Sequence, residues 1–334
     1  MDYSQILSQQ FNIKEEYAKN IITLLDDGNT IPFIARYRKE MHGSMDDQLI
    51  REFAEKLEYL RGLDKRRDEI RSLIDAQEKL TDEINLALDK AATLSELEDI
   101  YRPYRPKRKT RASIAKEKGL EPLANDILKQ EKGFDPSKSA VDYIDEEKGV
   151  TSVEDAIQGA MDIIAELVSD NAEIRKRIRN LTNANGVLVS VATDEEKDSV
   201  YKNYYDYKEP VKKIAGHRVL AVNRGEKEGF LKVSVETDSE KPLNSIFRAM
   251  ITDKNQLCSD IIREACTDAY QRLIYPSIER EVRNDLTDTA SENAMKVFAV
   301  NLKQLLMQPP VKGKTVLALD PGYRTGCKLS LIHI

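Results

Sequence analysis

The sequence contains no tryptophan, and only 6% of its residues are aromatic. It has no uninterrupted run of about 18 apolar residues, which argues against a membrane-spanning helix. The N-terminus, MDYSQILSQQ, lacks the basic and then apolar order of a secretion signal. Because 33% of the residues are charged, we expect a mainly α, heavily solvated cytoplasmic protein rather than a β-sandwich.

The other absences concern chemistry. Three cysteines are an odd number, and Cys258 and Cys266 lie on one helical pattern where a disulfide between them is implausible, so we expect reduced thiols. We find no zinc-ligand spacing, glycine-rich phosphate loop, nucleophile motif or paired carboxylates, and we expect His217 to be structural. The sequence therefore predicts no catalytic residue, no metal site, no cofactor and no enzyme.

Apolar residues at helical spacing predict helices along most of the chain. One covers residues 14–26, and a second, short helix begins near Pro32, with Ile34 and Tyr37 expected to pack inward. Cationic side chains project from it elsewhere: Arg36, Arg38 and Lys39. Helix, tight turn and helix with late basic residues indicate a helix-turn-helix element, although generic helical hairpins share this pattern.

Longer helices are predicted over residues 46–76, after a capping box at Thr151 and Glu154, and for about 30 residues from Pro276. The charged residues 175–179 are expected on a helix surface. Two short strands, GVLVSV and LKVSV, are expected to pair. The tyrosines of residues 201–207 could stack bases, but we favour a role in seating a loop on the core.

The most distinctive surface stretch lies between Tyr101 and Lys118, where eight cationic residues accompany one acidic residue, Glu117. Pro103 and Pro106 deny its first part a regular helix. An extended basic segment with interleaved tyrosines can present cations to phosphates and rings to unstacked bases. The residues expected to contact phosphates are Arg102, Arg105, Lys107, Arg108, Lys109 and Arg111.

A structural interpretation of the same stretch is compatible with the first. Its arginines and tyrosines could pair with the acidic LSELED just upstream and hold the loop against neighbouring helices. Exposed ion pairs of this kind contribute little stability individually.

Near the C-terminus, Val316 to Leu319 form an apolar run typical of a strand buried on both faces. Asp320 at its end could be a metal ligand in an α/β sheet, or simply part of an Asp-Pro-Gly turn. One strand alone offers no partner for its backbone, so we expect it to be poorly anchored. Residues 329–334, LSLIHI, match the translation of a common transposon-adapter sequence and are expected to be a read-through scar.

Several long blocks, in the same order, resemble the Tex family of bacterial transcription accessory proteins. They are IPFIARYRKE, LEDIYRPYRPKRKTRASIAKEKGLEPLA, HRVLAVNRGEKEG, YPSIEREVRNDLTD and VLALDPGYRTGCKL. The resemblance implies an elongated, multi-helix protein with short β-strands. It implies an N-terminal helical region with a helix-turn-helix over residues 1–200, a central helical region with a long connecting helix over 201–311, and the first strand of a truncated YqgF-type, RNase H-like α/β domain over 312–328.

In that family a helix-hairpin-helix region and an OB-fold RNA-binding domain follow, so we expect this chain to be a fragment that lacks them. The function implied is non-enzymatic binding of nucleic acid as a transcription accessory protein, with RNA or DNA as the partner and RNA as the first expectation. One alternative is a truncated metal-dependent nuclease or resolvase, to which Asp320 would contribute one carboxylate of a two-metal site. Another is a protein-interaction platform for RNA polymerase or the ribosome.

Overall fold

The structure of the protein is a computed structural model that describes residues 2–252, 254–309, 312–323 and 325–333. It is mainly α-helical with a few short antiparallel strands, as predicted. The chain divides into two compact units, Met1–Asn180 with Ser239–Pro276 and Leu181–Asp238 with Ser277–Ile334. None of the helices in the described ranges combines the length with the apolar character that a bilayer crossing requires.

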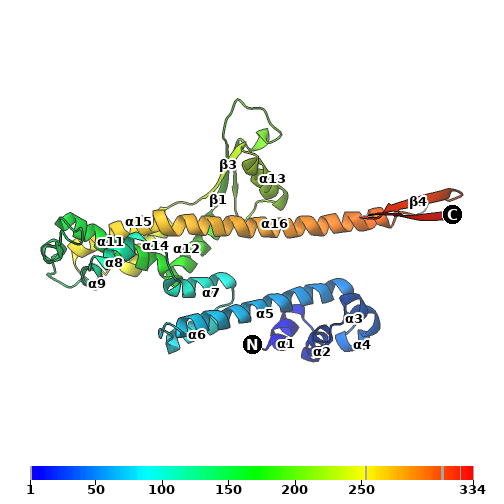
Figure 1. Cartoon of the computed structure of the whole chain (residues 1–334), viewed down its shortest axis with the longest axis horizontal. Helices are drawn as coiled ribbons and strands as arrows, with labels where there is room; N and C mark the ends of the chain where they lie inside the picture. Colours follow the sequence, from blue (N-terminus) through cyan, green and yellow to red (C-terminus); the bar gives the residue numbers. More distant parts are fainter. Residues whose placement is uncertain (1, 253, 310–311, 324, 334) are drawn as a thin grey trace. The chain divides into compact units, whose positions relative to one another are not determined.

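In the first unit, the N-terminal helices pack around the first half of a long helix, α5 (Asp47–Asp75) (Figure 1). They are α1 (Tyr3–Phe11), α2 (Glu15–Asp26), α3 (Ile31–Tyr37) and α4 (Lys39–His42). Ile21, Ile34 and Phe53 are fully buried in this cluster. The helices predicted at 14–26 and after Pro32 are thus confirmed.

The boundaries in this region have simple physical causes. Asp46 caps α5, since its carboxylate accepts a hydrogen bond from the Leu49 amide at 2.8 Å. Gly43, between α4 and α5, has a φ of +66°, and a Cβ there would lie 2.7 Å from a ring carbon of Tyr17. The prediction that Tyr37 packs inward is wrong, because its side chain is 64% exposed while Ile34 takes the inner position.

The second half of α5 is covered by α6 (Asp82–Lys90) and α7 (Leu94–Tyr101), which share with it a separate apolar cluster. Arg67 of α5 is buried among them. Its Nε donates to the Leu88 carbonyl at 2.9 Å and its Nη2 to the Ala91 carbonyl at 3.0 Å. This arginine therefore donates to carbonyls at the C-terminal end of α6, where the Leu88 carbonyl also accepts from the Ala91 amide at 3.3 Å.

The rest of the first unit is organised around α11 (Val153–Asp170), which packs against α8 (Arg111–Glu117), α9 (Glu121–Lys129) and α15 (Gln256–Asp268). The remaining helices are α10 (Pro136–Ala140), the start of α12 (Ala172–Asn185) and α14 (Glu240–Met250). The predicted capping box lies one residue later than expected. Ser152 accepts from the Asp155 amide at 3.1 Å, and the Asp155 carboxylate bonds to Thr151.

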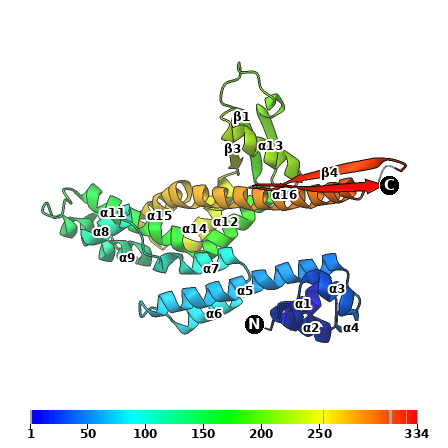
Figure 2. The same ribbon diagram turned by 45° about the vertical axis from the view of Figure 1, so that its right-hand side comes forward.

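The second unit contains a three-stranded antiparallel sheet in the order β2-β1-β3, with α13 (Gly216–Lys227) alongside it (Figures 1 and 2). Its strands are β1 (Val187–Ala192), β2 (Asp206–Pro210) and β3 (Leu231–Glu236). The predicted pairing of GVLVSV with LKVSV is confirmed, with Leu188 opposite Val235. Tyr201 is 6% exposed in the core beneath α13, which confirms the expected seating role of the tyrosine cluster.

The outer edge of β3 is covered by side chains rather than by another strand. The amide of Val233 donates to Glu226 at 3.2 Å, and the amide of Val235 donates to Glu279 at 3.0 Å. Arg283 donates to the Val233 carbonyl at 2.9 Å. These contacts occupy the backbone groups through which an open strand edge would pair with another chain.

A π-helical stretch, Ala269–Ile274, joins α15 to the long helix α16 (Tyr275–Leu306), so the predicted long helix from Pro276 is confirmed. Its first half packs on the sheet and α13, where a Cβ on Gly216 would lie 3.2 Å from the Ala290 Cα. Its second half is different, because every residue from 292 to 306 is exposed.

β4 (Thr315–Pro321) and β5 (Cys327–His333) form a two-stranded antiparallel hairpin. The apolar run at Val316 to Leu319 is exposed rather than buried on both faces, since none of the described elements covers it. It does have a partner strand, contrary to expectation, because residues 329–332 of the suspected adapter sequence pair with it. Arg324 and Ile334 lie outside the described residues.

Candidate nucleic-acid interface

The basic segment leaves the end of α7 as one short 3-10 turn, Arg102–Tyr104, and then runs without regular structure to Thr110. The two prolines account for this, since each lacks a donor and restrains the preceding residue. Thr110 then caps α8, accepting from the Ser113 amide at 3.0 Å, while Ser113 Oγ accepts from the Thr110 amide at 2.8 Å. The cations are therefore held on an extended loop between two anchored helices.

The tyrosines of this segment belong to the core. Tyr101 is 5% exposed, and the guanidinium of Arg66 lies 5.8 Å from the centre of its ring. Tyr104 is partly buried against the same apolar cluster. The expectation that Tyr101 presents its face to unstacked bases is therefore wrong, and the segment offers charge more than stacking surface.

Two of the predicted phosphate contacts point to α11 instead of solvent. Lys107 forms an ion pair with Asp170, and its Nζ lies 3.4 Å from Glu166 Oε1. Arg102 Nε lies 3.3 Å from Asp170 Oδ1. Burial, together with the nearby Arg175, lowers the pKa of Arg102. These contacts support the structural interpretation of the segment and add α11 as a partner; of the acidic LSELED, Glu98 lies 3.8 Å from Arg105.

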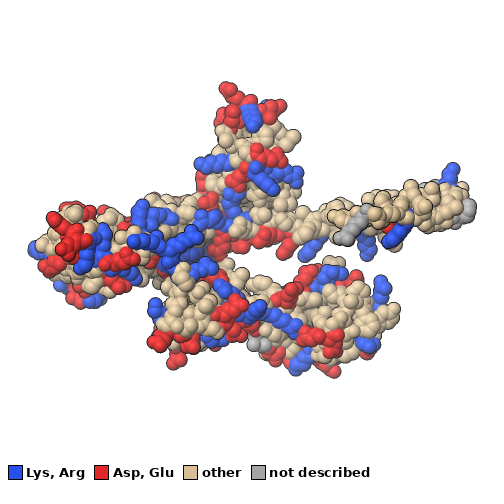
Figure 3. Space-filling view, in the orientation of Figure 1, with Lys and Arg blue, Asp and Glu red and all other residues tan. Residues whose placement is uncertain are grey.

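The other four cations form an exposed row. Arg105 and Lys109 have side chains that are 62% and 70% exposed, with carboxylates of Glu98 and Glu117 no closer than 3.8 and 3.7 Å. Arg108 and Arg111 are also exposed, and within the described part of the chain Arg108 has no ion-pair partner. In Figure 3, basic side chains are interspersed with acidic ones over the first unit. We define the exposed basic row as Arg105, Arg108, Lys109 and Arg111.

A buried ionic cluster was missed by sequence reasoning. Asp99 is 5% exposed and accepts from Arg175 Nε and Arg179 Nη2, both at 2.5 Å. The expectation that residues 175–179 lie on a helix surface is wrong for these two arginines. Their spacing of four was the available signal, since it places both on one face of α12, but Asp99 follows no periodic pattern.

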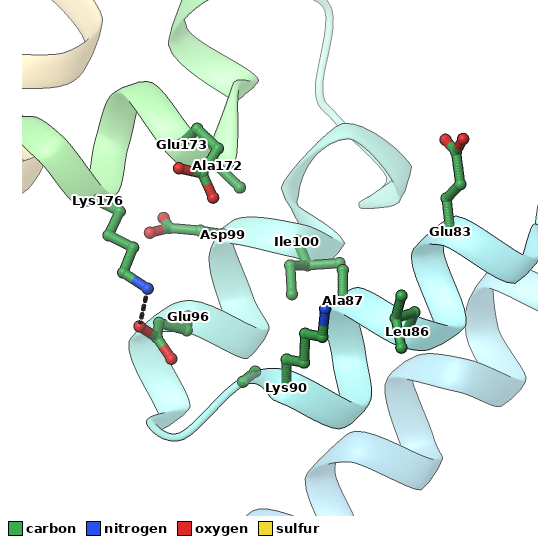
Figure 4. Close-up of a pocket in the computed structure, with 11 residues that line it drawn as sticks. Glu83, Leu86, Ala87, Lys90, Glu96, Asp99, Ile100, Ala172, Glu173 and Lys176 are labelled. Carbon is green, nitrogen blue, oxygen red and sulfur yellow. Dashed lines mark ion pairs between the residues drawn. The ribbon is translucent and has the colours of Figure 1, made fainter.

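A cleft of about 440 Å³ opens between α6, α7 and the start of α12 (Figure 4). Its lining includes Leu86 and Ile100, and a 2.8 Å ion pair between Lys176 and Glu96 crosses one side. That pairing lowers the pKa of Glu96. Because the cleft has an apolar lining with mixed charges at its rim, it lacks the convergent cations that phosphate recognition requires.

The N-terminal cations occupy another part of the first unit, beside the cluster of α1 to α5 rather than the cluster that carries the basic segment. Arg36 and Lys39 are exposed. Arg38 lies over the Phe33 ring, 5.2 Å from its centre. Helix-turn-helix proteins contact base edges with the N-terminal residues of their second helix. In α3 these residues are Ile31, Pro32 and Phe33, whose side chains cannot form hydrogen bonds with bases.

The described residues show no metal centre in this arrangement. Among residues 2–252, 254–309, 312–323 and 325–333, no three His, Cys, Asp or Glu side chains come together to hold a metal ion. Asp320 is 75% exposed and lies 3.9 Å from Lys328. Cys258 and Cys266 are buried free thiols, and burial raises the pKa of Cys266 to about 12, so it is not a reactive thiolate at neutral pH.

Comparison with protein families gives two matches. A Tex-like protein N-terminal domain matches residues 1–75, and a Tex central region-like model matches residues 131–298. The exposed basic row lies between these two matched ranges.

Individual relatives align along nearly the whole chain. Uncharacterized protein YdcI of Bacillus subtilis is 45% identical over 99% of this chain and 47% of its own length. Transcriptional accessory protein Tex of Neisseria gonorrhoeae is 36% identical over 99% of this chain and 44% of its own. S1 RNA-binding domain-containing protein 1 of Homo sapiens is 32% identical over 99% of this chain and 34% of its own length. The chain thus spans about half the length of the bacterial relatives, and about a third of the human one.

Proposed function

The chain belongs to the Tex family of transcription accessory proteins, and on that premise we propose that it binds nucleic acid, RNA by preference, through its exposed basic row. The observation that carries the proposal is the row itself. Three of its cations stand on the extended loop between α7 and the capped start of α8, and the fourth, Arg111, is the first residue of α8; one of them, Arg108, has no ion-pair partner among the described residues. The role is that of a non-enzymatic accessory factor.

The chemistry of the row favours phosphate contacts over base recognition. Guanidinium and ammonium groups bind phosphate oxygens through charge-assisted hydrogen bonds, which position a strand without reading its sequence. Tyr101, the aromatic side chain nearest the start of the segment, is buried. We therefore propose binding that depends strongly on salt and weakly on sequence. Arg36, Arg38 and Lys39 form a second, smaller group of candidate contacts around α3.

The domain interpretation belongs to the same proposal. Residues 1–200 would be the N-terminal helical region with a helix-turn-helix formed by α2 and α3, residues 201–311 the central region, and residues 312–328 the beginning of a YqgF-type domain. Since α3 presents apolar residues at its start, we assign it a packing or backbone-contacting role rather than base recognition. RNA binding is also supported by the name of the human relative, which refers to an S1 RNA-binding domain.

The test is reversal of three charges of the row, Arg105→Glu, Arg108→Glu and Lys109→Glu together. Affinity for a single-stranded RNA of about 20 nucleotides is measured between about 50 and 200 mM salt. Loss of three phosphate contacts should flatten the slope of log affinity against log salt by about 2 units. An unchanged slope would remove the row from the interface.

The matched control reverses three exposed lysines elsewhere in the first unit, Lys129, Lys138 and Lys148. It changes the net charge by the same amount. If this control flattens the slope equally, RNA responds to the net charge of the protein and not to the row.

A protein-interaction surface is a second candidate function, favoured by a separate observation. Phe298, Leu305 and Leu306 on the second half of α16 are 61 to 72% exposed, and Figure 3 shows few charged atoms there. Contiguous exposed apolar side chains mark contact surfaces. We expect the immobilised protein to retain purified RNA polymerase or ribosomes after nuclease treatment. We expect the variant Phe298→Ser with Leu305→Ser to lose this retention. Retention by that variant would refute this surface.

A further inference from the structure

The last turn of α11 makes an unusual contact with the basic segment. Asp170 pairs with Lys107 and lies 3.3 Å from Arg102, while Glu166 accepts from the Thr110 hydroxyl at 3.0 Å and lies 3.4 Å from Lys107. The side chains of Asp170 and Glu166 are only 12% and 20% exposed. Each carboxylate thus faces two donors of the segment.

These carboxylates occupy an unfavourable place on their own helix. The C-terminal end of a helix carries partial negative charge, and acidic side chains are disfavoured there. α11 ends at Asp170 and has no basic residue in its last turn. The cations of the basic segment therefore supply the compensation for both acids, which ties the two elements together electrostatically.

The donors are those that commonly surround a phosphate. A guanidinium, an ammonium and a hydroxyl converge on these two acids, and one of the three donors, Lys107, lines a cleft of about 400 Å³ whose lining also includes Arg105, Glu166 and Asp170. The Nε of Arg102 is buried and has no hydrogen bond of suitable geometry, although Asp170 is near. Burial, followed by the nearby Arg175, lowers the pKa of Arg102.

We propose that Arg102, Lys107 and Thr110 form a cradle for a backbone phosphate of the nucleic acid, which Glu166 and Asp170 fill in the free protein. A phosphate entering the cradle replaces the carboxylates as the partner of Lys107 and Thr110. This inference rests on the proposed function. The exposed basic row binds the nucleic acid first. Glu166 and Asp170 then weaken the final complex, because they compete with the phosphate for the same donors.

The first experiment removes the competitor by isosteric substitution, Glu166→Gln with Asp170→Asn, in the full chain. The probe is a fluorescent oligouridylate of about 20 nucleotides at low salt. If the closed arrangement holds in roughly nine molecules of ten, its loss tightens binding about tenfold. No tightening, or weaker binding, would overturn the cradle.

The matched control is Glu117→Gln with Glu121→Gln, which also removes two negative charges beside the segment. These acids are 65% and 53% exposed and pair with Lys109 and Lys116 at 3.7 and 2.9 Å. Less than about a twofold gain is expected, because exposed pairs compete weakly. An equal gain in both double variants would mean that only the net charge matters, and would refute the cradle.

A mutant cycle gives a readout that a merely structural ion pair would not move. Lys107→Ala should weaken binding more in the Glu166→Gln, Asp170→Asn background than in the unmodified protein, since only there is Lys107 free to meet phosphate throughout. Equal losses in both backgrounds would contradict the proposal. Should the double variant fail to fold, as judged by circular dichroism, Glu166→Gln alone serves in the same cycle.

Failure of this inference can be told apart from failure of the proposed function. If reversal of Arg105, Arg108 and Lys109 leaves RNA affinity unchanged, the interface itself is wrong. If that reversal weakens binding while the Glu166 and Asp170 variants behave like the control, the interface stands and the cradle alone is refuted.

Discussion

The two longest described helices, α5 with 29 residues and α16 with 32, differ in how they are covered. α5 buries side chains from Ile50 to Ile74, since the N-terminal helices cover its first half and α6 with α7 its second. The residues that α16 buries, Ile278, Val282 and Ala290, all lie in its first half. Beyond them, residues 292–306 are exposed.

The difference teaches where helix stability comes from in this protein. Helix propensity alone sustains short helices poorly in water, and most of the stability of a helix in a protein comes from packing of its apolar face. α5 gains this packing over its whole length. The second half of α16 carries equally apolar residues, such as Phe298 and Leu305, but among the described residues nothing packs on them.

The largest expected effect comes from removing one phenylalanine from each helix. Phe53→Ala in α5 should lower the free energy of unfolding by about 3 to 5 kcal/mol, because Phe53 is fully buried. Phe298→Ala in α16, where the ring is 66% exposed, should change it by less than about 0.5 kcal/mol. Denaturant unfolding of both full-length variants measures this. Similar losses in the two would show that the end of α16 is covered in solution.

Both helices could be predicted from sequence, but their covering could not. The apolar stripe gave α5 as residues 46–76 against the observed Asp47–Asp75, and α16 as about 30 residues against 32. A stripe of the same kind runs through Phe298 and Leu305. Periodicity reports the shape of a helix, whereas burial depends on partners from elsewhere in the chain.

The candidate interface shows the same limit. The basic segment stood out by composition, but which of its cations are neutralised depended on Asp170, 63 residues further along the chain from Lys107. Strand β2 was missed because DYKEP contains no apolar alternation, and its pairing is supplied by β1. The buried Asp99 had no sequence signal, since its partners lie 76 and 80 residues away.

A smaller loss of stability is expected when the arginine through which each helix contacts a neighbouring element is replaced. Arg67→Met keeps an apolar stem but removes the donors to the Leu88 and Ala91 carbonyls, and should cost about 3 kcal/mol. Arg283→Met removes the donor to the Val233 carbonyl and the ion pair with Glu226, and because this side chain is 22% exposed the change should cost about half as much. The midpoints of denaturant unfolding, compared at a constant m-value, measure both losses of stability. The reverse order would mean that the first half of α16 is held more firmly than α5.

The smallest effect concerns an ion pair on α5 and its dependence on pH. Asp26 at the end of α2 accepts from both terminal nitrogens of Arg61, at 2.7 and 2.8 Å, and these bonds lower the pKa of Asp26. Both side chains are over 40% exposed, so Asp26→Asn should cost only about 0.5 kcal/mol at neutral pH.

The direction of the pKa shift of Asp26 determines how its contribution to stability varies with pH. A carboxyl whose pKa is lower in the folded state stabilises the protein above its unfolded pKa, about 3.9, and loses this contribution as pH falls through the folded value. The difference between Asp26→Asn and the unmodified protein should therefore shrink below about pH 4. Glu292 in the exposed half of α16 has no ion-pair partner within the described ranges, so Glu292→Gln should change the free energy of unfolding at neutral pH by less than Asp26→Asn does. An equal loss for Glu292→Gln at neutral pH would mean that the exposed half of α16 has partners in solution, and the contrast between the two helices would fail.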